Sequence, residues 1–426
     1  HTSMLRRDPL GVVAGIAPWN YPLNMAIWKM GPALAVGNTF ILKPSERDPS
    51  VPNRLAELFL EAGLPAGIFQ VVHGDKEMVE AICMEIVMKK DRLANQQIES
   101  IYFGGGTPTT LPSVALQKIL ATIEQWFSIS ANAEITIEAN PDDLTAQKIT
   151  ELRQLPFNRF SIGTQSFFNE DLIWMNRAHN AQEATDCIKR SQDAGFEKLT
   201  IDLIYGYPLL NNEKWISNIQ TAIALEVPHI SAYSLTVEPR TALAHAIEKG
   251  KQPMVSDDQS AEQFLMLVDT LTGNGFDHYE ISNYSLPGKY AVHNTNYWKG
   301  VPYLGIGPSA HGFDGTNRYI NIANNAKYLE SIGKKQLPET IEQLSNADQF
   351  NEYVMTSLRT MWGISLEKVN AQFGKKPQEL ILKNIKPYLS DEKVYIDNHH
   401  IYLSNKGKLF ADGIAAALFL DEDELN

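Results

Sequence analysis

The middle of the chain alternates short apolar segments with amphipathic segments, and this repeat constrains the fold more than any other feature. Apolar runs of this length predict buried strands, and the amphipathic runs predict helices. Strands joined in this way by helices form a parallel sheet through right-handed crossovers, and several such units close into a barrel or partial barrel. The predicted strands are Ser100–Phe103, Glu134–Ala139, Arg159–Gly163, Leu199–Ile204 and Ile230–Leu235. The predicted helices between them lie near Ser113–Trp126, Ala146–Leu155, Ala181–Ala194 and Glu213–Leu225. We therefore expect an α/β protein built on a partial (β/α) barrel.

The rest of the chain predicts further domains on either side of this barrel. A chain of 426 residues has room for two or three domains. The N-terminal part reads as a βαβαβ Rossmann-like unit, and the C-terminal part reads as helices around a hairpin at Val394–Leu403, which suggests a winged-helix-like domain. The expected divisions are residues 1–75, a barrel at 76–240, a barrel-capping region at 241–345 and a C-terminal domain at 346–426.

The composition excludes several classes of protein. The net charge of −13 disfavours nucleic acid as a partner, because phosphate backbones attract basic surfaces. No apolar run reaches the roughly 18 residues of a membrane span. Arg6 and Arg7 are not followed by the apolar region of a signal peptide, so we expect a cytoplasmic protein. Two cysteines, Cys83 and Cys187, are too few for a disulfide framework.

Polar residues gather at the ends of successive predicted barrel strands. The first strand runs into a glycine-rich turn, Gly104–Gly106, whose backbone can approach a ligand closely. Glu138 and Gln165 end the next two strands, Arg177 follows in a loop, and Asp202 lies in the fourth strand. Each of these four groups taken alone is more often a satisfied structural residue than a ligand. Together, two carboxylates, an amide and a guanidinium can hold an amino-acid group and a ribose diol.

From about Glu77 to the end, these strings resemble the radical-SAM family of oxygen-independent coproporphyrinogen oxidase, and within it the HemW-type haem-chaperone branch. The resemblance implies a radical-SAM-type barrel that binds S-adenosylmethionine. It implies that Gly105, Gly106 and Thr107 cradle the amino group of this cofactor. It also implies contacts to the methionine and ribose parts of the cofactor from Glu138, Gln165, Arg177 and Asp202.

A second motif, His293-Asn294-Thr295-Asn296-Tyr297-Trp298, lies in a stretch rich in glycine and aromatic residues. One interpretation is an aromatic loop packed over the barrel mouth. The other is a porphyrin-binding loop, since imidazole is a common axial ligand of haem iron and aromatic rings offer flat apolar faces. The resemblance favours haem or porphyrin as the partner. The residues it implicates are His293, Asn294, Tyr297 and Trp298.

The family's cluster motif is missing from this chain. The family holds a [4Fe–4S] cluster on a CxxxCxxC loop, and the resemblance implies that cofactor, yet Cys83 and Cys187 lie inside predicted helices without neighbours at ligand spacing. Neither cysteine provides a metal site, and we assign no catalytic residue. An enzyme of this class would need the cluster, so radical activity is not expected. Ile68–Val72 is expected to take the place of the first barrel strand, followed by a short turn in place of the cluster loop.

Residues 1–75 resemble a different family, the NAD(P)-dependent aldehyde dehydrogenases. The matching strings are Pro9–Val13, Ala17–Pro22, Gly37–Thr39 and Leu42–Glu46. The resemblance gives Asn20 the role of an oxyanion-hole amide, and places Lys43, Ser45 and Glu46 against an adenosine ribose. The nucleophilic cysteine and the glutamate base of that family are absent, so this part is a fragment.

The two resemblances together predict a chimera of two unrelated families. Three interpretations of the chain remain open: a haem chaperone-like protein that binds S-adenosylmethionine and haem, a non-functional chimera, and an NAD-binding aldehyde dehydrogenase fragment.

Overall fold

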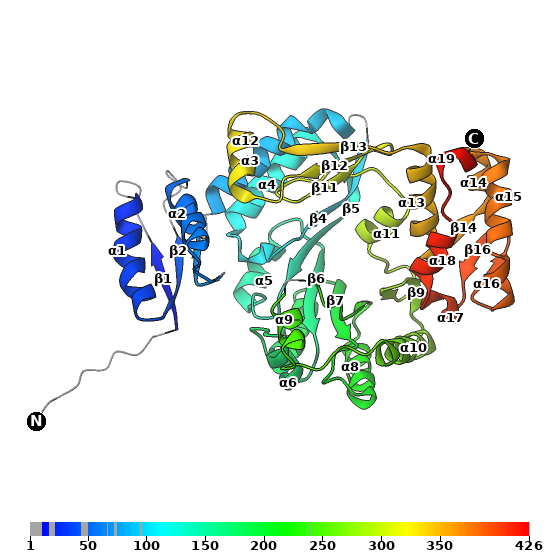
Figure 1. Cartoon of the computed structure of the whole chain (residues 1–426), viewed down its shortest axis with the longest axis horizontal. Helices are drawn as coiled ribbons and strands as arrows, with labels where there is room; N and C mark the ends of the chain where they lie inside the picture. The colour runs from blue at the N-terminus through cyan, green and yellow to red at the C-terminus, as the bar shows by residue number, and fades with distance from the viewer. Residues whose placement is uncertain are drawn as a thin grey trace, which may run out of the picture.

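A computed structural model describes residues 11–16, 22–43, 50–65, 67–71, 75–93, 96–239 and 241–425. Within these residues the chain forms four β-sheets with helices around them. Figure 1 shows a small sheet near the N-terminus at one end of the molecule, the largest sheet in the middle, and the C-terminal helices at the other end.

The largest sheet has seven strands in the order β4-β5-β6-β7-β8-β10-β9. Strands β4 to β8 are parallel, while β10 is antiparallel to both β8 and β9. The sheet curls into a half-barrel (Figure 1). The predicted α/β partial barrel is thus confirmed. Its strands are β4 (Gln97–Phe103), β5 (Ser128–Ala139), β6 (Arg159–Gln165), β7 (Lys198–Tyr205), β8 (His229–Ser234), β9 (Asp277–Glu280) and β10 (Asn283–Ser285).

Helices cover the half-barrel because both partners carry apolar faces. Ile162 of β6, Ile201 of β7 and Ile188 of α7 are fully buried in one core cluster. Helix α7 begins at a capping box, in which the Asn180 side chain accepts from Glu183 N at 3.0 Å and Asn180 N donates to Glu183 at 2.8 Å. The helices of this layer are α4 (Ser113–Trp126), α5 (Ala146–Arg153), α6 (Asn169–Trp174), α7 (Ala181–Asp193), α8 (Asn212–Ala224), α9 (Ala242–Glu248) and α10 (Asp257–Gly273).

The expected position of Ile68–Val72 is wrong. The strand found there, β3 (Phe69–Val71), pairs with β2 (Thr39–Lys43) in the parallel sheet β1-β2-β3, not with β4. Phe69 and Phe40 pack together in the small core of that sheet, which explains the pairing. Strand β4 is therefore an edge strand of the half-barrel. The other elements of the small unit are β1 (Val12–Ile16), α1 (Pro22–Ala35) and α2 (Ser50–Glu61).

A third sheet, in the order β11-β12-β13, lies beside helix α3 (Asp75–Met88). Lys89, just after α3, is 2% exposed and pairs with Glu85 at 2.6 Å and with Glu339 at 3.1 Å. Its ammonium also donates to Gly305 O at 2.8 Å. These bonds join α3 to the loop before β11. The elements here are α11 (Val292–Trp298), β11 (His311–Phe313), β12 (Asn317–Asn321), α12 (Asn325–Gly333) and β13 (Glu339–Gln343).

The C-terminal part is a helical unit around a hairpin, with its own core that includes Phe350, Ile381 and Ile401. No helix among the described residues is long and apolar enough to cross a bilayer. The strands of the C-terminal unit are β14 (Ile364–Ser365), β15 (Val394–Asp397) and β16 (His400–Leu403). Its helices are α13 (Asn346–Leu358), α14 (Leu366–Phe373), α15 (Lys375–Asn384), α16 (Lys386–Ser390), α17 (Asn405–Lys408), α18 (Ala411–Ala417) and α19 (Glu422–Leu425).

Candidate functional site

The glycine-rich turn after β4 has a backbone conformation that favours glycine. Gly105 and Gly106 have φ angles of 80° and 81°, in the left-handed region that side chains rarely adopt. A Cβ on Gly104 would lie 2.5 Å from the Tyr102 ring and 2.7 Å from Glu138 Oε1. The turn is therefore closely apposed to the carboxylate at the end of β5.

Glu138 accepts two hydrogen bonds at this turn. Gly105 N donates to Oε2 at 3.0 Å, and the Tyr102 hydroxyl donates to Oε1 at 2.8 Å. Burial raises the pKa of Tyr102, and the nearby negative charge of Glu138 raises it further. The phenol thus stays protonated and remains a donor to Glu138 at neutral pH.

Gln165 and Arg177 converge over Gly163. A Cβ on Gly163 would lie 3.1 Å from Gln165 Nε2 and 3.2 Å from Arg177 Nη2. Gln165 has a φ of 66°, a conformation that is uncommon for residues other than glycine and occurs often at binding sites. Arg177 donates to Asn140 Oδ1 at 2.6 Å and to Gly163 O at 3.2 Å.

Asn140 also belongs to this site, and the sequence interpretation did not include it. Its Nδ2 donates to Thr107 Oγ1 at 3.2 Å, while its Oδ1 accepts from Arg177. It therefore links the turn after β4 to the arginine. Asn140 stands two residues after Glu138, and the alternation of side chains along an extended strand was the signal that could have placed both on one face.

Asp202 of β7 is partly buried and faces an inner cavity of about 290 Å³ that Glu138 also lines. Burial raises the pKa of Asp202 to about 7, and repulsion from Glu138 adds to the shift. Deeper in the cavity, Arg159 lies 3.4 Å from Glu134 and donates to Thr200 Oγ1 at 2.8 Å. The cavity is polar and is closed by a buried ion pair that the sequence interpretation also missed.

A larger cavity of about 750 Å³ opens beside the free edge of β4. Apolar side chains of β4, α3 and α4 line it, together with the glycine-rich turn and His293 and Tyr297 of α11. His293 Nδ1 lies 3.1 Å from Ser100 Oγ, which leaves Nε2 for a ligand. Burial lowers the pKa of His293, so the imidazole is neutral at pH 7 and suited to metal ligation.

The His293 motif is a short helix, α11, rather than the expected loop. The helix turns its residues in different directions. His293 and Tyr297 line both cavities, and Asn294 lines the inner one, where it donates to the Tyr279 hydroxyl at 2.9 Å. Trp298 packs against Tyr297 and Arg359 instead.

The cysteines do not fit an iron–sulfur cluster. The chain has two cysteines, whereas the cluster of this class takes three thiolates. Cys83 and Cys187 are both buried, and burial raises the pKa of Cys187 to about 12. Among the residues that the structure describes, no group of three His, Cys, Asp or Glu side chains could hold a metal ion.

Of the four residues assigned to the N-terminal unit by its resemblance, the structure describes only Lys43. Lys43 is the last residue of β2. Asn20, Ser45 and Glu46 lie outside the described residues.

Comparisons with known proteins agree with this architecture. The radical SAM superfamily model matches residues 71–222, and the HemN C-terminal domain model matches residues 344–410. The solved structure of coproporphyrinogen III oxidase (HemN) from Escherichia coli superimposes with a TM-score of 0.70 at 22% identity, covering 82% of this chain and 85% of that one. The half-barrel thus defines a protein of the radical-SAM fold class.

Two relatives specify the family. The heme chaperone HemW of Lactococcus lactis is 31% identical over 345 residues, which cover 81% of this chain and 90% of the relative. The heme chaperone HemW of Bacillus subtilis is 30% identical over 348 residues, covering 81% and 92%. The chain belongs to the HemW family. The aldehyde dehydrogenase family model matches residues 1–109, which supports the predicted fragment.

Proposed function

We propose that this protein binds haem or a porphyrin in the cavity beside β4, with His293 as the axial ligand, and so acts as a haem-binding chaperone. The observation that carries the proposal is the neutral, partly buried imidazole of His293, whose Nδ1 is held by Ser100 and whose Nε2 is left for iron. Asn294 and Trp298 support the ligand helix, since Trp298 Nε1 donates to Asn294 Oδ1 at 3.1 Å.

The walls of the cavity suit a flat apolar ligand. Ile82, Ile86 and Ile101 line it together with Phe103 and Tyr297, and Tyr297 is 51% exposed. Aromatic and branched aliphatic side chains offer the contact surface that a macrocycle requires. The volume of about 750 Å³ leaves room for one such ligand.

A haem titration followed in the Soret region tests this proposal. The wild-type chain is expected to shift the Soret band, and His293→Ala is expected to abolish the shift. His311→Ala is the matched control, because His311 is an exposed histidine on β11 of the same capping region. An unchanged shift in His293→Ala would falsify the assignment of His293.

We also propose that S-adenosylmethionine binds at the ends of β4 to β7, on the residues that the family resemblance names. The polar groups of these residues fit the cofactor: Glu138 suits an ammonium group, Arg177 suits a carboxylate, and Asp202 suits a ribose diol. A Cβ on Gly105 or Gly106 would meet no atom within 4 Å, so the turn leaves open space for the ligand beside these two glycines. When bound, this cofactor would supply a sulfonium centre.

Isothermal titration with S-adenosylmethionine tests the second part of the proposal. Binding by the wild-type chain that is weakened in Glu138→Gln is expected. Iron and sulfide content after anaerobic reconstitution is expected to be far below one cluster per chain, because the thiolates are missing. A stoichiometric cluster would show that other ligands replace them and would restore radical chemistry. Absence of both haem and cofactor binding would favour the alternative of a non-functional chimera.

A further inference from the structure

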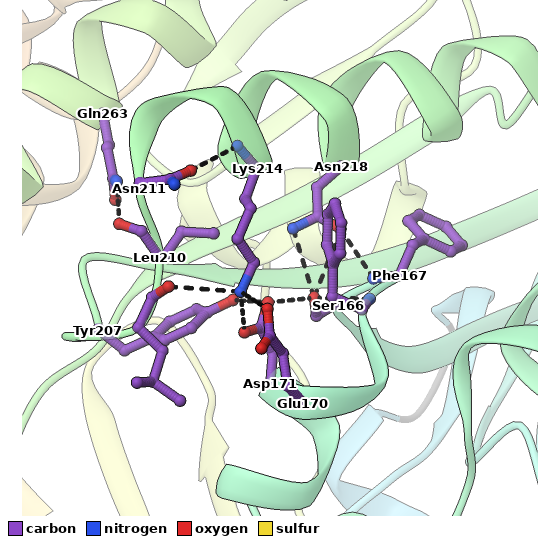
Figure 2. Close-up of polar contacts among 12 residues, drawn as sticks. Ser166, Phe167, Glu170, Asp171, Tyr207, Leu210, Asn211, Lys214, Asn218 and Gln263 are labelled. Carbon is purple, nitrogen blue, oxygen red and sulfur yellow. Dashed lines mark hydrogen bonds and ion pairs between the residues drawn. The ribbon is translucent and has the colours of Figure 1, made fainter.

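The turn after β6 is held by one buried carboxylate, that of Asp171 in α6 (Figure 2). Its Oδ2 accepts from Ser166 Oγ at 2.9 Å and from the Tyr207 hydroxyl at 2.7 Å. Its Oδ1 lies 2.5 Å from the ammonium of Lys214 in α8. Both oxygens of this fully buried carboxylate are therefore hydrogen-bonded, which is the condition for a stable buried carboxylate.

Helix α8 adds further bonds to the same turn. Lys214 also contacts Glu170 at 2.8 Å, and its ammonium supplies the counter-charge for Asp171. One turn further along the helix, Asn218 is fully buried and its Oδ1 accepts from Phe167 N at 2.7 Å. Figure 2 shows both side chains reaching from α8 toward Ser166 and Asp171.

The residue just before this cluster is Gln165, which has the left-handed φ of 66°. The chain reverses locally there, since Ser166 N donates to Thr164 O at 2.8 Å. A non-glycine residue in this conformation costs of order 1–3 kcal/mol and persists only where its surroundings hold it. The bonds to Ser166 and Phe167 hold the two residues that follow it.

The same cluster also fixes Arg177. Asp171 O accepts from Met175 N at 2.8 Å, and Leu172 O accepts from Arg177 N at 2.8 Å, so the arginine is bonded to the short helix that carries Asp171. Gln165 and Arg177, which lie on either side of this helix in the sequence, then meet over Gly163. Their relative position depends on how α6 is seated.

We propose that Asp171 is a positioning residue: through Ser166 and the seating of α6, it sets the relative position of Gln165 and Arg177 for the ligand bound at the ends of β4 to β7. This inference rests on the proposed binding of S-adenosylmethionine. Asp171 is fully buried, and its two carboxylate oxygens are taken up by Ser166, Tyr207 and Lys214, so it acts through other residues and not by contact with the ligand.

The test is a double-mutant cycle on the full chain, with S-adenosylmethionine affinity measured by titration calorimetry. Asp171→Asn is expected to weaken binding about tenfold, the size of one lost charge-assisted hydrogen bond. The same substitution in an Arg177→Ala background is expected to have a much smaller effect, because its route to the ligand is already gone. Additive effects, or unchanged affinity in Asp171→Asn, overturn the proposal. If Asp171→Asn does not fold, Tyr207→Phe replaces it in the cycle, because this substitution removes only one of the hydrogen-bond donors to Asp171.

Glu85→Gln is the matched control. Glu85 is another fully buried carboxylate with several donors, among them Gly307 N at 2.8 Å and the Tyr328 hydroxyl at 2.6 Å. The Glu85→Gln variant is expected to be less stable than the wild-type chain while keeping its affinity for S-adenosylmethionine. Equal loss of affinity in this control would mean that any buried carboxylate has the effect, and would overturn the specific role of Asp171.

Hydrogen exchange separates this proposal from the proposed function. Asp171→Asn is expected to speed exchange in residues 163–177 and to leave residues 344–410 unchanged. If the wild-type chain does not bind S-adenosylmethionine, the proposed function fails and exchange alone decides whether Asp171 anchors the turn. Faster local exchange then supports the anchor, and unchanged exchange overturns it.

Discussion

The ring of Tyr102 stacks on the imidazole of His293, with ring centroids 4.9 Å apart and planes inclined by 24°. The hydroxyl of the same tyrosine donates to Glu138 at 2.8 Å. One side chain at the edge of the half-barrel therefore touches both the proposed cofactor site and the proposed haem ligand.

The first prediction concerns the hydroxyl of Tyr102. Tyr102→Phe keeps the ring against His293 but removes a donor that competes for Glu138 Oε1. We expect S-adenosylmethionine to bind a few-fold more tightly, since the carboxylate is then more available to the ammonium group, and we expect haem affinity to change little. Calorimetric and Soret titrations measure the two affinities.

Tyr303→Phe is the control for this prediction. Tyr303 lines the same large cavity, and its ring lies 5.6 Å from that of Tyr297. Removal of its hydroxyl should leave the affinity for S-adenosylmethionine unchanged. Weaker cofactor binding in Tyr102→Phe would contradict the idea that the phenol competes for Glu138.

The second prediction follows from the raised pKa of Asp202, about 7 in the folded chain. An unfolded aspartate titrates near pH ~3.9, so between about pH 4 and pH 7 the folded chain holds a proton that the unfolded chain has released. The contribution of Asp202 to stability therefore falls as pH rises through this window. Asp202→Asn does not titrate and should gain about 1–3 kcal/mol relative to wild type between pH 5 and pH 8. Urea unfolding of both proteins at the two pH values measures this gain, and a constant difference would contradict it.

Much of the barrel could be predicted from the sequence because each strand carries its own pattern. The apolar runs that end at Phe103 and Ala139 give strands whose carboxyl ends must meet at one edge of a parallel sheet. The positions of Glu138 and Gln165 at this edge follow from that rule alone, without knowledge of the packing. The role of each residue came from the family resemblance, and the assignments of cofactor and haem contacts stay predictions.

Other features could not be predicted, because they depend on contacts between distant segments. The apolar pattern of Phe69–Val71 is the same whether the strand pairs with β2 or with β4, and packing against Phe40 decides. The cluster around Asp171 joins four separate elements or loops, so no local pattern reveals it. The alternation of side chains along β5 could have predicted that Asn140 lies on the same face as Glu138. Its hydrogen bond to Arg177 could not be predicted, because it depends on the packing of a distant segment.

The third prediction concerns the buried charges beside α3. Glu85 is fully buried and pairs with Lys89 at 2.6 Å. Glu85→Ala leaves Lys89 with a weaker set of partners and leaves several donors unsatisfied, so we expect a loss of about 3–5 kcal/mol in the free energy of unfolding. Lys334→Ala is the comparison, because the Lys334–Glu330 pair is more than half exposed and such pairs contribute about 0–1 kcal/mol. Chemical denaturation followed by tryptophan fluorescence measures both, and losses of equal size would contradict the prediction.

The last prediction concerns the N-terminal sheet. Among the residues that the structure describes, its core consists of six buried hydrophobic side chains, all between Ala26 and Phe69, and the other four core clusters contain only residues from Met78 onward. So small a core stabilises a unit only marginally. We expect calorimetry of the full chain to show a separate, lower-temperature transition for this sheet, which is lost when residues 1–74 are deleted. The main transition and the haem titration should be retained in the shortened chain, because no side chain of the half-barrel core is removed. Loss of the main transition on deletion would show instead that the N-terminal sheet supports the half-barrel, and that the two parts have become one folding unit.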